Sequence, residues 1–118
     1  MKRGHKDLRA WQTAMLLVED IYQLSSTFPK EELFGLTSQM RRAAVSVPSN
    51  IAEGSARNGT KELLYFLGVA TGSLAELDTQ LDLVHRLKYS AETSSVQARL
   101  DEVSALTLAL MKSLKDKV

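Results

Sequence analysis

The sequence has no cysteine, so disulfide bonds and cysteine-ligated metal sites are excluded. Only two prolines and six glycines are present, which leaves little material for long loops or for the many tight turns of a sheet protein. Uninterrupted apolar runs are also short. Neither a signal peptide nor a membrane-spanning helix is therefore predicted, and a cytoplasmic protein with no membrane partner is expected.

No single sign of charge dominates the chain. Fifteen Lys and Arg residues oppose fourteen Asp and Glu residues, and the net charge is +1. No global field therefore points to nucleic acid, and a surface for a polyanion would have to arise from local clustering or from assembly. The 118 residues are enough for a single domain with one hydrophobic core.

What the chain does contain is a set of long amphipathic patterns. Good helix formers dominate, apolar residues recur with the helical period, and no stretch shows strict alternation. These patterns predict an all-α protein, an antiparallel up-down-up-down four-helix bundle formed by residues 1–118 as one domain. The expected segments are a mobile basic arm over 1–6 and helices over about 8–25, 37–57, 61–88 and 92–116.

Gln39–Arg57 is the most informative of these segments. One face of the predicted helix is apolar and should be buried in the bundle; it consists of Leu36, Met40, Ala43, Val47, Ile51 and Gly54. A second side is also apolar or small, where a lone bundle should carry Lys and Glu; it consists of Ala44, Val45, Pro48, Ala52 and Ala56. We infer that this second side meets another subunit.

The third predicted helix repeats this feature. Gly68 and Gly72 lie in its interior, where each glycine costs up to about 1 kcal/mol of helix stability. Close approach of another helix would offset that cost. The residues predicted for an oligomer interface are therefore Val45, Pro48, Ala52, Gly68 and Gly72.

A polar stripe runs beside the apolar faces of Gln39–Arg57; it consists of Gln39, Arg42, Ser46, Asn50, Glu53 and Arg57. In one interpretation the stripe is structural, with an i,i+4 ion pair and a hydrogen-bond network. In the other it lines a groove for phosphate or a partner. The candidates for binding nucleic acid or a partner are Arg41, Arg42, Asn50, Arg57 and Lys61.

Two further predictions concern the ends of the helices. Asp7 is expected to cap the first helix. The connection 25–35 is too apolar for a free loop, so Phe28, Leu33 and Phe34 are expected to pack back on the bundle.

No constellation of catalytic residues is evident. The chain has two histidines, His5 in the arm and His85 in the segment Asp82–His85, which supplies a Glu-x-x-His-like spacing only once. A phosphate-binding glycine loop is absent from the sequence. We expect neither an enzyme, nor a cofactor, nor a metal, nor a small-molecule substrate; a metal-binding bundle is the remote alternative.

Three segments together resemble a known family. FPKEELFGLTSQMRRAAVSVPSNIAEGSAR (28–57) resembles the signature of the four-helix-bundle family named for 23S rRNA intervening sequences, and DLRAW (7–11) and FLGVATGSLAELDTQL (66–81) also match its pattern. The resemblance covers nearly the whole chain after Lys6. It implies a homopentamer, and relatives that include the accessory variability proteins of diversity-generating retroelements, which associate with a reverse transcriptase and with nucleic acid through a basic pentamer surface.

The resemblance and the residues together lead to two expectations of function. The first is a homo-oligomeric, and by resemblance pentameric, binding or scaffold protein whose partner is RNA, DNA or a nucleoprotein. The second is a scaffold for proteins only, in which the polar stripe is structural.

Overall fold

The computed structural model describes residue 1 and residues 3–117. Within these residues it contains four α-helices and no strand, so the predicted all-α fold with four helices is confirmed. The helices are α1 (Arg9–Ser25), α2 (Leu36–Ala56), α3 (Thr60–Arg86) and α4 (Ser94–Lys115). Two short 3-10 helices, η1 (Gly4–Asp7) and η2 (Lys30–Glu32), precede α1 and α2.

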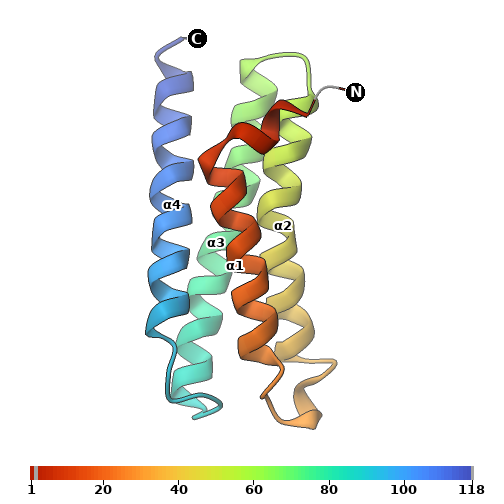
Figure 1. Cartoon of the computed structure of the whole chain (residues 1–118), viewed down its shortest axis with the longest axis vertical. Helices are drawn as coiled ribbons and strands as arrows, with labels where there is room; N and C mark the ends of the chain where they lie inside the picture. The colour runs from red at the N-terminus through yellow and green to blue at the C-terminus, as the bar shows by residue number, and fades with distance from the viewer. Residues whose placement is uncertain (2, 118) are drawn as a thin grey trace.

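Each helix lies beside the next one in the chain, and α4 returns to lie beside α1. Figure 1 shows both chain termini at the upper end of the molecule, together with the turn between α2 and α3. The α1–α2 and α3–α4 connections lie at the lower end. Residues that are far apart in the sequence therefore meet at each end of the molecule.

The core consists of the apolar faces that the helical period predicts. Every member of the first apolar face of α2 is buried, and Leu67, Ala70, Leu74 and Leu77 of α3 are buried opposite it. Burial of this kind contributes about 25 cal/mol for each Å² of apolar surface removed from water. Amphipathic pattern, and not local propensity, therefore determines how the four helices face one another.

The second apolar side of α2 is only partly free, which corrects the sequence-based prediction. Ala44 and Pro48 are buried by the chain itself, because α1 packs on this side. Val45 is 41% exposed, and Ala52 is half-buried. An interface on this side can therefore use Val45 and Ala52 but gains little from Pro48.

Helices α2 and α3 lie close together near the turn that joins them. A Cβ atom added to Gly54 would lie 2.8 Å from the Phe66 Cβ and 3.0 Å from a Leu63 methyl carbon. Such contacts are too short, so only glycine fits. Gly59 in the turn has φ +145°, a conformation that other residues rarely adopt. These two glycines fix how α3 folds back on α2.

The N-terminal segment differs from the prediction. A mobile arm is predicted over residues 1–6, but Gly4–Asp7 forms η1, which contacts α1 and α2. Gln12 Nε2 donates a hydrogen bond to the Lys6 carbonyl oxygen at 2.8 Å. Asp7 is not the cap of α1, since Leu8 occupies that position and makes no side-chain cap. Lys2, part of the predicted arm, lies outside the described residues.

At the lower end, one hydrogen bond ties the two connections together. The Tyr89 hydroxyl donates to Glu32 Oε2 at 2.7 Å, and the Leu36 amide donates to Glu32 Oε1 at 3.1 Å. These bonds lower the pKa of the Glu32 carboxyl, and the bond to Glu32 raises the pKa of the Tyr89 phenol. Phe28 is buried beside the Tyr89 ring, 5.7 Å between centroids, as the sequence predicts.

The other two apolar residues of this connection do not pack back. Leu33 is 53% exposed and Phe34 is 93% exposed, so the prediction for them is wrong. Glu32 holds the connection through the Leu36 amide and through Tyr89, which leaves the tip of the segment pointing outward. Phe34 is therefore the most exposed aromatic side chain among the described residues.

Replacing Tyr89 with phenylalanine should flatten the dependence of stability on pH. A lowered pKa at Glu32 stabilises the fold above about pH 4.3, and this stability is lost as pH falls through the lowered pKa. A raised pKa at Tyr89 stabilises it below about pH 10, and this is lost as pH rises through the raised pKa. Thermal melts from about pH 3 to about pH 11 measure both losses.

The matched control is Tyr65→Phe, because the Tyr65 hydroxyl makes no hydrogen bond among the described residues. That variant should keep the wild-type pH profile. If Tyr89→Phe and Tyr65→Phe give the same profile, the Tyr89–Glu32 bond does not stabilise the lower end.

Membrane insertion is tested by helix length and hydropathy. In the described part of the chain, no helix is both long and apolar enough to cross a bilayer.

Candidate interaction surfaces

The side chains in the middle of the polar stripe form hydrogen bonds within their own chain. Ser46 Oγ and Ser73 Oγ lie 2.8 Å apart and join α2 to α3. Asn50 Nδ2 donates to the Ser46 carbonyl oxygen at 2.8 Å and to Ser46 Oγ at 2.9 Å. Both donor hydrogens of Asn50 are therefore used, and this part of the stripe fixes the α2–α3 pair.

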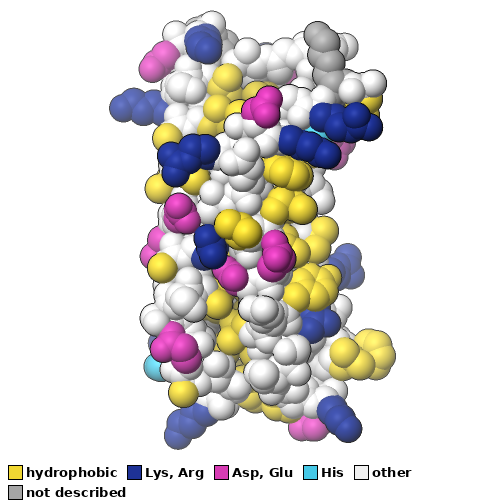
Figure 2. All heavy atoms as spheres, in the orientation of Figure 1, with side chains coloured by type: hydrophobic (Ala, Val, Ile, Leu, Met, Phe, Trp, Pro, Cys, Tyr) yellow, Lys and Arg dark blue, Asp and Glu magenta, His cyan; other side chains and the backbone are white. Residues whose placement is uncertain are grey.

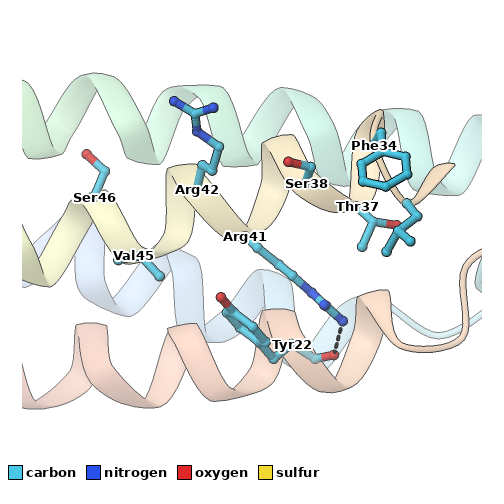
Figure 3. A pocket seen from close by; sticks show the side chains of 9 residues that line it. Tyr22, Phe34, Thr37, Ser38, Arg41, Arg42, Val45 and Ser46 are labelled. Carbon is cyan, nitrogen blue, oxygen red and sulfur yellow. Dashed lines mark hydrogen bonds between the residues drawn. The ribbon is translucent and has the colours of Figure 1, made fainter.

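Neighbouring arginines on α2 point in different directions. Arg41 reaches toward α1, where Nε donates to Ser25 Oγ at 2.9 Å and the guanidinium lies 4.6 Å from the Tyr22 ring centroid. Figure 3 shows Arg42 directed to the opposite side, away from Tyr22. Within the described residues no ion pair or hydrogen bond holds the Arg42 guanidinium, and the residue is exposed. Arg42 is thus the arginine of this pair that is available to a partner.

Arg57 and Lys61 flank the turn at the upper end. Arg57 pairs with Glu53 at 2.7 Å and lies over the Phe66 ring, 5.0 Å from its centroid. The hydrogen bond with Glu53 raises the pKa of Arg57. The two side chains are about half exposed, and surface ion pairs of this kind contribute little to stability. Lys61 is exposed at the start of α3.

The candidate binding residues therefore do not form one cluster. Arg42 and Arg57 are fifteen positions apart along α2, roughly 22 Å along its axis. Arg41 and Asn50 are held by their own chain. The structure separates one exposed arginine near the lower half of α2 from a group of cations at the upper end.

The upper end is more basic than the sequence indicates. The start of α1, the end of α2, the start of α3 and the end of α4 all meet there (Figure 1). Basic residues outnumber acidic ones in these segments, and Figure 2 shows Lys and Arg side chains around this end. We call this group the basic end; its described members are Arg3, Lys6, Arg9, Arg57, Lys61, Lys112, Lys115 and Lys117.

The binding residues predicted from the sequence do not include the lysines at the end of α4. Lys112, Lys115 and Lys117 are exposed at the end of α4. Leu8 and Arg9 line a hollow together with Leu106 and Leu110, which puts the start of α1 against the end of α4. The predicted helix order already implies that the start of α1 and the end of α4 lie at the same end of the bundle, because an even number of alternating helices returns the C-terminus to the N-terminal end.

An apolar groove runs along the seam between α1 and α2. Its lower part is a hollow of about 670 Å³ lined by Tyr22, Leu33, Phe34, Arg41, Arg42 and Val45, among others. Its upper part is a hollow of about 350 Å³ lined by Trp11, Met15, Val18, Val45, Pro48, Ser49 and Ala52. Val45 lines both, so the two hollows adjoin at this residue. Figure 2 shows hydrophobic side chains in a run along this side of the molecule.

The predicted glycines of α3 lie on a different surface. An added Cβ at Gly68 or Gly72 would meet no atom of the described chain within 4 Å. Tyr65, Val69 and Leu83 on the same side are exposed. The bundle itself therefore supplies no helix that approaches these glycines. We call this surface the outer stripe of α3; it consists of Tyr65, Gly68, Val69, Gly72, Glu76 and Leu83.

The residues considered for a metal do not come together. In residues 1 and 3–117, no group of three or more His, Asp or Glu side chains is close enough to hold a metal ion. Asp82 and His85 are both exposed on α3.

Comparison with known proteins identifies a family. A family model described as 23S rRNA-intervening sequence protein matches residues 6–109, which is most of the chain and includes all of the polar stripe. A search of curated proteins gives no match.

Proposed function

The chain belongs to the 23S rRNA-intervening sequence protein family, and we propose that it is a non-enzymatic homo-oligomeric scaffold that holds nucleic acid or a nucleoprotein. In this proposal antiparallel bundles assemble into a ring, with five copies as the expected number. The cytoplasm remains its expected location.

One observation carries the oligomeric part of the proposal. Two long surfaces that ought to be polar in a lone bundle are apolar or small, namely the α1–α2 groove and the outer stripe of α3. Phe34 at 93% exposure and Tyr65 at 67% exposure are the most exposed aromatic side chains on them. Exposed apolar surface of this extent is typical of a contact with another protein. Assembly would remove it from water.

The basic end supports the nucleic-acid part. Basic residues outnumber acidic residues in the segments that form it. These cations lie at one end of an elongated molecule of 45 × 25 × 19 Å. In a ring of parallel copies these ends would form one basic surface. Weak phosphate contacts then add across the copies, so a chain with a net charge of +1 could bind a polyanion.

A scaffold for proteins only is the second candidate, and the polar stripe favours it. The Ser46–Ser73 and Asn50–Ser46 bonds account for the middle of the stripe as structure. In that case the α1–α2 groove and the basic end would both bind protein partners.

A gel-shift titration with single- and double-stranded RNA and DNA tests the proposal. Binding through phosphates should be strong at about 50 mM salt and should weaken by a large factor at about 200 mM, with little dependence on sequence. An absence of any shift at about 50 mM salt would reject the nucleic-acid part and leave the protein scaffold.

A further inference from the structure

We infer that the occupant of the α1–α2 groove is the outer stripe of α3 from a second copy of this chain. The inference rests on the proposed assembly and adds which faces meet. The groove and the outer stripe lie on different sides of the bundle, since α3 packs against α2 and α4 and not against α1. Two different faces that fit each other make a head-to-tail contact, and such contacts close into rings when the rotation between copies allows it.

Whether these faces can fit depends on which residues of α2 and α3 lie at the same height along the bundle. Ser46 is level with Ser73, and Gly54 is level with Phe66. Paired antiparallel helices of equal rise keep this register along their length. Val45 is therefore level with positions 74–75, Ala52 with positions 67–68, Arg42 with positions 77–78 and Phe34 with positions 85–86.

A ring whose axis runs along the bundle keeps all copies at the same height. Each residue of the groove then meets the outer stripe of its neighbour at its own level. Ala52 would face the open backbone at Gly68, and Val45 would lie within one helical turn of Gly72, where a second helix can approach closely. Phe34 would face Leu83 and Leu87, which are 41% and 50% exposed. Apolar surface is thus opposite apolar or small surface at each level.

The charges agree with the same register. Arg42 is exposed at the rim of the lower hollow and has no partner among the described residues. Glu76 is exposed on the outer stripe, where its Oε2 accepts one hydrogen bond from Gln80 at 3.3 Å. Glu76 lies one or two positions from the level of Arg42, so the long arginine side chain of one copy would reach the carboxylate of the next. A pair of opposite charges at the rim fixes register and excludes wrong contacts.

Cysteine pairing tests this docking directly, because the natural chain has no cysteine. Val45→Cys and Gly72→Cys are made as separate variants and refolded together before mild oxidation. The mixture should give disulfide-linked pairs that contain one chain of each kind. Each variant alone should give none. In the matched control, Val45→Cys is refolded with Ala105→Cys, which lies at an exposed position on α4. This mixture should also give no disulfide-linked pairs.

Charge exchange provides the second test. Arg42→Glu places two carboxylates opposite each other and should weaken assembly by on the order of 100-fold. Adding Glu76→Arg to that variant should restore assembly, which a merely damaged fold would not do. Circular dichroism checks that each variant keeps its helices.

The outcomes separate this inference from the proposed function. If the wild-type chain assembles but Val45→Cys alone forms linked pairs, the groove meets another groove and the inference is overturned while the scaffold remains. Assembly with equal linkage to Ala105→Cys overturns it in the same way. If the wild-type chain is a monomer at micromolar concentration, both the inference and the assembly are wrong.

Discussion

Replacing Gly54 with valine should lower the free energy of unfolding by about 3 kcal/mol, the upper part of the range for overpacked cores. The first added carbon already lies 2.8 Å from the Phe66 Cβ, and a β-branched side chain adds two more carbons in the same space. Both Phe66 and Leu63 belong to α3, close to the turn. The two helices would have to separate at this close contact. Denaturant unfolding followed by circular dichroism measures the loss of stability.

Ala105→Val on the exposed face of α4 is the control for this prediction. It lowers helix propensity, whereas Gly54→Val raises it, so propensity alone predicts the opposite order. A greater loss of stability at Gly54 therefore reports packing. Equal or greater stability of Gly54→Val would show that α2 and α3 do not approach as closely as described.

Reversing charges at the basic end should have the second large effect. Lys61→Glu together with Lys115→Glu should weaken binding to RNA or DNA by about tenfold for each lysine, because each change removes one attraction and adds one repulsion. The slope of log affinity against log salt should also become shallower by about 0.9 for each phosphate that the variant no longer neutralises. The gel-shift titration measures both quantities.

The matched control makes the same change in net charge at the opposite end. Lys30 and Lys88 are exposed in the two connections at the lower end. Lys30→Glu together with Lys88→Glu should leave affinity close to that of the wild type. If both double variants weaken binding equally, net charge matters and the basic end does not.

Much of the fold follows from periodicity alone. The predicted helices 8–25 and 37–57 differ by no more than one residue at each boundary from α1 and α2, and 61–88 and 92–116 differ by up to two from α3 and α4. The apolar face of α2 is buried as predicted, because a helix has one way to hide six residues at that spacing. Helix caps are less predictable, since Asp7 enters η1 and leaves Leu8 at the cap position of α1.

The surfaces are predictable only in part, for a physical reason. A helical wheel shows which residues share a side of one helix but not which neighbouring helix covers that side. Periodicity therefore assigns Pro48 to an interface although α1 buries it, and apolar character predicts that Phe34 packs on the bundle although it is exposed. The basic end depends on four segments that meet only in the folded chain.

The central claim is that copies of this chain cover each other's apolar surfaces. Light scattering on the wild-type chain at micromolar concentration tests it most directly. An assembly of about five chains of 13.1 kDa each is the expected result. A stable particle of a single 13.1-kDa chain, with Phe34 and Tyr65 open to water, would contradict it.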